Sequence, residues 1–216
     1  TGNYPYFDPV DGYYISQDQT DARWWTGEGN VLFTRWDQHK IVAGLEFQHE
    51  TKVVQQSFDL SAGLPPSSVL DIDTATRSLG IYVQDEWTIA PNWIANLGIR
   101  HDSHSRYGES NTPRLALIWQ PNPQSTLKLL SGQAYRNPDA FEAFYASGTT
   151  QIVNPSLQPE SIRTLQLVGE QQLSERTRSS ATLFRYDMSN MIDSVTLAGG
   201  ELQYQNFPSV TAEGLE

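Results

Sequence analysis

The sequence predicts an all-β fold in which the strands form an antiparallel up-and-down meander. Three observations carry this prediction. Apolar and polar residues alternate with a period of two, short and long connections alternate along the chain, and most tryptophans lie beside the short connections. No segment of the 216 residues has the apolar stripe, with a period of about 3.6 residues, that an amphipathic helix would show.

The alternation defines the strands in chain order. One strand is predicted at residues 41–47, directly after a short turn. The clearest strand is at residues 78–89, where the odd positions are apolar except Asp85 and the even positions are polar or small except Tyr82. Because side chains alternate across a strand, such a segment has one apolar face. Residues 93–102 repeat the pattern, and less regular strand-like segments follow at 114–120, 125–135, 161–173 and 177–188.

The connections between these strands differ in length in a regular order. Short turns are predicted at residues 36–39, 90–92, 121–124 and 174–176, and long loops at 55–75, 103–111 and 136–160. In an antiparallel meander, successive connections lie at opposite ends of the sheet. All the short turns therefore fall at one end and all the long loops at the other, as in an outer-membrane barrel with short periplasmic turns.

Tryptophan placement supports the same orientation. Four of the six tryptophans lie within about three residues of a short turn: Trp36, Trp87, Trp93 and Trp119. We interpret them as an interfacial aromatic belt, since the amphipathic indole ring favours the membrane–water interface. The fold class is therefore expected to be a segment of a transmembrane β-barrel, which contacts outer-membrane lipid.

Composition excludes several other classes of protein. The net charge of −11, from 14 basic and 25 acidic residues, argues against a nucleic-acid partner. The absence of cysteine excludes a disulfide scaffold, a thiol nucleophile and a cysteine-ligated zinc site. No apolar run approaches the roughly 18 residues of a membrane-spanning helix. No catalytic or nucleotide-binding motif and no clear acid–base pair is present, so neither an enzyme nor a cofactor is predicted.

Two motifs lie between residues 134 and 161. The first consists of Tyr135, Arg136, Pro138 and Glu142, and the second of Asn154, Pro155, Leu157, Pro159 and Glu160. Pro138 is expected to end a strand ladder, and Pro155 and Pro159 to hold an extended run that enters the next strand. Ion pairs from Arg136 to Glu142 and Glu160 are expected at the rim. We expect all nine residues to shape the rim and loop rather than to contact a ligand.

These motifs resemble the C-terminal barrel of TonB-dependent outer-membrane receptors of the siderophore receptor type. Asn137 stands where alanine is usual in that family. The hairpin at residues 82–87 and 97–102, the strand at 183–192 and the segment 204–216 are similar to further parts of the same barrel, in the same order. The resemblance covers about residues 30–216.

The resemblance implies active import of a scarce nutrient across the outer membrane of a Gram-negative bacterium, and a ferric siderophore is the expected nutrient. It also implies a 22-stranded barrel, an N-terminal plug and a TonB box. This chain has room for about eight to ten strands. Residues 1–216 are therefore expected to be a partial barrel without the plug and the remaining strands, with residues 1–21 as the remnant of an extracellular loop. TonB would act through the missing N-terminal region, and a small-molecule metal chelate would be the ligand.

Alternatives remain open at this stage. The chain could be a soluble β-sandwich that binds carbohydrate or protein, or part of a passive porin-like channel. Haem uptake ranks below siderophore uptake, because residues 139–153 lack the histidine that the family's haem receptors carry there. The run from His101 to His104 and the pair Asp71 and Asp73 are expected to be solvated side chains, so no metal site is predicted. The unpaired edges of a partial sheet are expected to promote edge-to-edge self-association.

Overall fold

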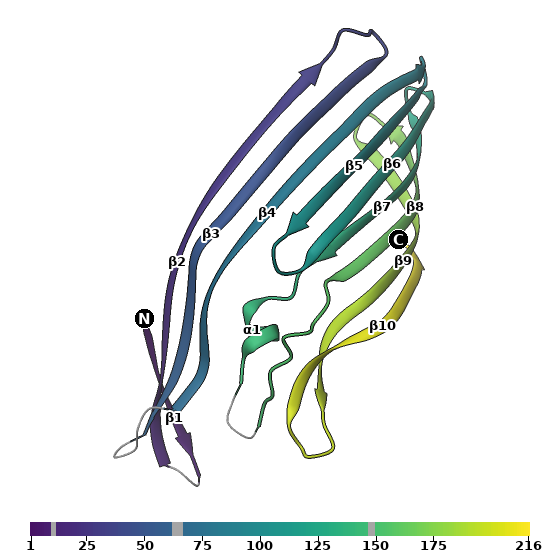
Figure 1. The fold of residues 1–216 in the computed structure, drawn as a ribbon. Helices are drawn as coiled ribbons and strands as arrows, with labels where there is room; N and C mark the ends of the chain where they lie inside the picture. Colours follow the sequence, from purple (N-terminus) through teal and green to yellow (C-terminus); the bar gives the residue numbers. More distant parts are fainter. Residues whose placement is uncertain (10–11, 62–66, 147–149) are drawn as a thin grey trace.

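The computed structural model describes residues 1–9, 12–61, 67–146 and 150–216. Its elements follow one another along the chain (Figure 1): β1 Gly2–Asp8, β2 Gly12–Phe33, β3 His39–Ser61, β4 Ser67–Ala90, β5 Trp93–His104, β6 Gly108–Asn122, β7 Ser125–Arg136, α1 Ala140–Phe144, β8 Glu160–Ser174, β9 Thr177–Thr196 and β10 Leu202–Leu215. In this part of the chain no helix is long and apolar enough to cross a membrane.

The ten strands form one antiparallel sheet in the order β1 to β10, with each strand paired to its neighbours in the sequence. Figure 1 shows this sheet as a single curved layer, with the short connections at the upper end of the view and α1 at the lower end. The prediction of an all-β, antiparallel up-and-down meander is confirmed. Within the described residues no pairing joins β1 to β10, so the sheet is open.

The register sorts the side chains onto two chemically different faces. The apolar face carries large hydrophobic side chains that are exposed, such as Ile81 at 54%, Ile99 at 50% and Leu165 at 49%. The polar face carries Tyr82 and Arg100, which lie opposite each other on β4 and β5. Such a sheet needs an apolar environment along one face and tolerates water along the other.

A soluble β-sandwich is ruled out by this arrangement. A sandwich has two sheets packed face to face over a hydrophobic core, whereas the described residues form a single sheet. In the described part of the chain only Ile72, Ala95, Ala143 and Leu157 are buried apolar residues, and they do not form one core along the strands.

The described residues of the segment 1–21 lie mostly in strands rather than in irregular structure, and their place in an extracellular loop stays a prediction. Nearly all of them lie in β1 and in the first half of β2. The pairing of these two strands runs from Gly2 opposite Asp18 to Asp8 opposite Gly12. Tyr6 stacks on Tyr14 with 5.6 Å between the ring centroids. Aromatic pairs and backbone hydrogen bonds stabilise this hairpin. Because both of its faces carry polar and aromatic side chains, the sequence lacks the one-sided alternation that would reveal strands.

Two of the three predicted long loops are also shorter than expected. β3 continues to Ser61 and β4 begins at Ser67, while β5 and β6 are joined by residues 105–107 alone. The residues 62–66 of the first loop lie outside the described residues. The connection at 137–159 is long, as predicted. The short connections at residues 34–38, 91–92, 123–124 and 175–176 all lie at one end of the sheet, which also agrees with the prediction.

Candidate functional site at the long-loop rim

Arg136 joins the two ends of the long connection. It is the last residue of β7, and its Nη1 and Nη2 atoms donate to the carboxylate of Glu142 on α1, at 2.9 Å each. Its Nε atom donates to Oε2 of Glu160, the first residue of β8, at 2.6 Å. The predicted ion pairs are therefore present. They fasten α1 and the start of β8 to the same guanidinium.

The first motif also starts the short helix. Asp139 is the N-cap of α1 and accepts a hydrogen bond from the backbone N–H of Glu142 at 2.8 Å, while the Glu142 side chain accepts from the backbone N–H of Asp139 at 2.9 Å. This capping box satisfies backbone donors that the helix start leaves free. Pro138 is buried, and its carbonyl accepts a hydrogen bond from the Tyr107 hydroxyl in the β5–β6 turn at 3.0 Å.

The second motif attaches the loop to β9 and β10. Asn154 donates through Nδ2 to the carbonyl of Tyr204 at 2.8 Å, and Leu157 is buried, with 4% of its surface exposed. The Asn206 side chain joins the segment to β10, because it accepts from the backbone N–H of Gln158 at 2.8 Å and donates to the Gln158 carbonyl at 3.0 Å. The sequence motif does not reveal Asn206, since it lies 48 residues away from its partner.

The two prolines of this motif occupy different local structures. Pro159 directly precedes β8, as the prediction of an extended entry requires. Pro155 instead lies in a turn, where the backbone N–H of Leu157 donates to the carbonyl of Asn154. The expectation of an extended conformation at Pro155 is wrong, because Pro also fits the first central position of a turn. Tyr135 is paired with Ser161 at the end of the β7–β8 ladder.

Electrostatics favour the charged form of the Arg136 cluster. This cluster lies at the strand ends, beyond the apolar band of the sheet. Its hydrogen bonds to the carboxylates of Glu142 and Glu160 raise the pKa of Arg136 above its ordinary value. In turn, the hydrogen bond from Arg136 lowers the pKa of Glu160, although partial burial opposes this shift, and the backbone N–H of Ile192 contributes in the same direction as Arg136. The loop anchor is therefore ionic at neutral pH.

Beside this anchor lies a hollow that could hold a ligand. It has a volume of about 470 Å³ and lies between the outer ends of the first strands and α1, with Tyr6, Asp18, Gln55, Leu70, Phe141 and Tyr145 among its lining residues. Phe141 stacks on Tyr145 at 4.3 Å between ring centroids. The hollow therefore combines aromatic surfaces with hydrogen-bonding groups. The sequence did not predict it, although the aromatic run at residues 141–145 is visible there.

The histidines near residue 101 do not gather into a metal site. Asp102 is buried on the polar face and accepts hydrogen bonds from Arg100, whose Nη2 also lies 2.9 Å from Glu46. His101 instead contacts the Asn111 side chain at 2.9 Å, and His104 accepts from the backbone N–H of Arg106. No group of three or more possible metal ligands occurs in the part of the chain that the structure describes.

The four tryptophans of the predicted belt lie at the short-connection end of the sheet. Trp93 and Trp119 are paired across β5 and β6 and stack at 5.5 Å between ring centroids. Trp87 stacks on His39 at 5.6 Å, and Trp36 approaches the same imidazole edge-on at 6.4 Å. Their role at a membrane interface remains a prediction.

Comparison with known proteins assigns the family. The sequence matches the family described as TonB dependent receptor-like, beta-barrel, over residues 1–216. The chain belongs to the TonB-dependent receptor family. The match covers the meander, the rim motifs and the tryptophans described above, and it places the chain in the β-barrel of that family and in the outer membrane of a Gram-negative bacterium.

Relatives of this TonB-dependent receptor barrel show what it resembles. It is 27% identical over 163 residues to the iron-regulated outer membrane virulence protein of Vibrio cholerae, covering 73% of this chain and 24% of that protein. It is 26% identical over 123 residues to the vitamin B12 transporter BtuB of the same species, covering 57% of this chain and 19% of that protein. The chain thus spans about a quarter or less of the curated relatives it matches.

A solved structure shows the same fold. The ferric enterobactin receptor PfeA of Pseudomonas aeruginosa, in a G324V mutant form, matches with a TM-score of 0.70 and 22% identity, covering 97% of this chain and 34% of that one. Family and fold are those of receptors and transporters rather than of enzymes.

Proposed function

We propose that the receptor containing this chain imports a ferric siderophore across the outer membrane by active transport powered by TonB. The observation that carries the proposal is the family match over residues 1–216. The iron-regulated relative supports the choice of an iron compound, because its similarity extends over 73% of this chain.

The ligand is a small-molecule metal chelate that contacts the rim on its way into the barrel. The hollow beside α1 supports this, since Phe141 and Tyr145 offer aromatic surfaces and Asp18 and Gln55 offer polar contacts. A structural neighbour of this chain is described in complex with enterobactin. The relative that transports vitamin B12 makes cobalamin the second candidate. Haem ranks below both, because residues 139–153 contain no histidine.

The chain supplies part of the barrel and depends on other parts of the receptor. The described part of the chain forms a ten-stranded section, and the proposal assigns the remaining strands, the plug and the TonB-binding segment to other parts of the protein. The apolar face contacts outer-membrane lipid. The residues at the rim serve ligand binding and transport and have no catalytic role in this proposal.

Uptake of radioactive iron tests the proposal. The receptor containing this chain is produced in bacteria that lack their own siderophore receptors, in strains with and without TonB, and the cells are given ferric enterobactin or labelled cobalamin. We expect iron uptake that requires both the receptor and TonB.

Three results would contradict this expectation. Uptake of cobalamin alone would replace the siderophore by the second candidate. Entry of either compound without TonB would indicate a passive channel. Failure of all uptake by a receptor that is folded in the outer membrane would exclude both nutrients.

A further inference from the structure

A polar hollow lies at the short-connection end of the sheet, on its apolar face. It has a volume of about 770 Å³ and is lined by residues of the β2–β3 turn together with the adjoining ends of β3 and β4: Arg35, Trp36, Asp37, His39, Ile41 and Asp85. A hollow with this many charged groups is unusual on a surface that otherwise carries exposed aliphatic side chains.

Two opposite charges in the hollow are free to bind a ligand. Arg35 and Asp37 are both exposed, and neither side chain makes an ion pair or hydrogen bond to the residues that the structure describes. His39 is held in place instead, because its Nδ1 lies 2.7 Å from Oδ2 of Asp85 and its ring stacks on Trp87. The hollow therefore offers one cation and one anion, beside aromatic surfaces.

Asp85 lies between Ile41 and Leu97 in the register, so it places a carboxylate on the apolar face. Its Oδ1 atom is buried and has no hydrogen-bond partner in the described part of the chain. A polar atom without a partner in such surroundings is destabilising. The polar hollow thus contains a carboxylate oxygen that can accept a hydrogen bond for which the described residues offer no donor.

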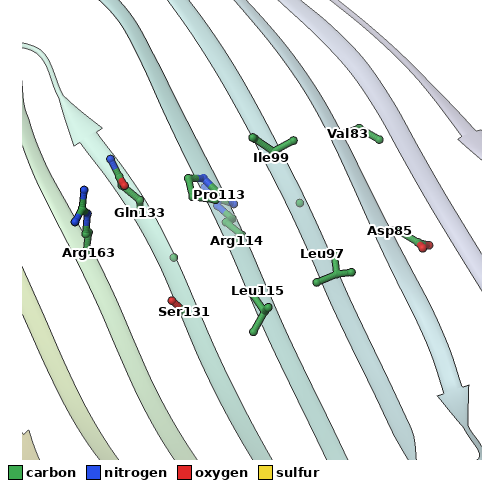
Figure 2. Close-up of a pocket in the computed structure, with 12 residues that line it drawn as sticks. Val83, Asp85, Leu97, Ile99, Pro113, Arg114, Leu115, Ser131, Gln133 and Arg163 are labelled. Atoms are coloured by element: carbon green, nitrogen blue, oxygen red, sulfur yellow. The ribbon is translucent and has the colours of Figure 1, made fainter.

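A second hollow adjoins the first, because Asp85 lines both. Its volume is about 640 Å³, and it extends along the apolar face over Val83, Leu97, Ile99 and Leu115, as Figure 2 shows. Gly98 and Gly132, which have no side chains to fill the space, also line it. The far side of the second hollow is polar, with Ser131, Gln133 and Arg163 among its lining residues. Together the two hollows form a site with a charged end at the turn and an apolar stretch beside it.

We propose that the two hollows bind one phospholipid with a primary-amine headgroup, from the leaflet of the outer membrane that faces the periplasm. The short connections face the periplasm in this family's architecture, so the polar hollow lies at the level of those headgroups. Arg35 binds the phosphate, Asp37 accepts hydrogen bonds from the ammonium, and an acyl chain lies along Leu97, Ile99 and Leu115. A primary ammonium fits better than choline, since a quaternary ammonium has no N–H to donate. The proposal rests on the family and its orientation, and not on the transported nutrient.

Lipid retention by the purified receptor tests this site. The receptor containing this chain is incubated in detergent with equal amounts of dioleoyl phosphatidylethanolamine, phosphatidylcholine and phosphatidylglycerol, and bound lipid is counted by native mass spectrometry. We expect one retained phosphatidylethanolamine, with about tenfold preference over each of the other lipids, the ratio that one charge-assisted contact supplies.

A matched pair of variants locates the binding. In R35Q/D37N the preference for phosphatidylethanolamine is lost. In E175Q/R176Q, which neutralises two opposite charges in the β8–β9 turn at the same end of the sheet, it is unchanged. Circular dichroism spectra of both variants that match the unaltered receptor check that the barrel is folded. Equal retention of all three lipids, or an undiminished preference in R35Q/D37N, would overturn the proposal. Equal retention of phosphatidylglycerol and phosphatidylethanolamine would remove the role of the amine.

Discussion

Arg136 shows how one side chain holds a long loop in place. Its three N–H groups contact two carboxylates, one from α1 and one from β8. The planar guanidinium makes this possible, because it presents several donors in fixed directions, whereas the ammonium of a lysine is a point charge. Both carboxylates are mostly buried, with 14% and 22% of the side chains of Glu142 and Glu160 exposed.

Replacement of Arg136 is therefore expected to loosen the loop. R136A should destabilise it by about 1 kcal/mol, since partly exposed ion pairs contribute about 0–1 kcal/mol each. Limited proteolysis within residues 139–157 measures this, and cleavage should become faster in R136A and, to a smaller degree, in R136K. R178A is the control, because among the described residues the Arg178 side chain hydrogen-bonds to Gln172 alone, at 3.2 Å beside the β8–β9 turn. Equal cleavage of R136A and the unaltered receptor would contradict the anchoring role.

The same anchor is expected to weaken in acid. Glu160 has a folded-state pKa below the ordinary value of 4.5, because Arg136 stabilises its carboxylate. A lowered folded pKa gives stability that is fully present above the ordinary value and is lost as the pH falls through the folded one. Hydrogen exchange of residues 150–160, corrected for the intrinsic rate, should therefore speed up below about pH 4.5. In E160Q the exchange should already be fast at pH 7 and should depend less on pH.

At the scale of elements, α1 depends on its first turn. The helix has five residues, and a helix of that length is not stable without external contacts. D139A removes the N-cap and should cost about 1 kcal/mol of local stability. D139N keeps an acceptor at the same position and serves as the control. Faster hydrogen exchange of the amides at residues 142–145 in D139A alone is the expected result, and equal exchange in both variants would argue against the capping box.

The hairpins extend beyond the apolar band, and this explains the errors in the predicted loops. β2, β3 and β4 have 22, 23 and 24 residues, whereas β5 has 12. The ends of the longer strands that lie beyond the apolar band have no lipid along one face. Their apolar and polar residues therefore have no reason to alternate. Hydrogen bonds between side chains, such as Ser57 to Asp18 at 2.7 Å, link these parts across the strands instead.

For the whole molecule, the two faces of the sheet should tolerate charge very differently. Leu165 lies on the apolar face, and its neighbour Gln166 lies on the polar face at the same depth, where it donates to the Tyr186 hydroxyl. L165R should cost about 2–4 kcal/mol if the position is near the bilayer midplane and less near an interface. Q166R should cost less, because its charge reaches the polar face. The yield of receptor inserted in the outer membrane compares the two variants, and equal yields would contradict the assignment of the faces.

The open edges of the sheet are a second property of the whole molecule. β1 and β10 each have one neighbouring strand in the described sheet, and only the start of β10, at Leu202, is also bridged by the rim loop at Gln151. Unpaired edge strands favour pairing with another chain. The expected edge-to-edge association of this section alone stays a prediction, and the additional strands proposed for the full receptor would occupy the same edges.

The rim motifs illustrate which parts of a site a sequence reveals. The pairing of Arg136 with Glu142 and Glu160 is predictable, because the charges are close in the sequence or lie in one recognisable motif. The contacts of Asn206 with Gln158, and the hollow between β1 and α1, are not, because they join segments that are far apart in the chain. Tyr107 belongs to the same group, since its bond to the Pro138 carbonyl depends on how two loops meet.

The sequence by itself determined the order of the strands from β3 onward, the all-β class, the division into apolar and polar faces, the end that carries the tryptophans, and the family, but it did not reveal β1 and β2. These properties follow from a local period of two and from short motifs, which act over a few residues. The tertiary structure alone decided where the strands end, how the rim loop attaches to β10, and how Arg35, Asp37 and Asp85 come to line one hollow on the apolar face. The physical reason is that the length of a ladder and the grouping of side chains depend on register between strands, and register is not encoded in any single strand.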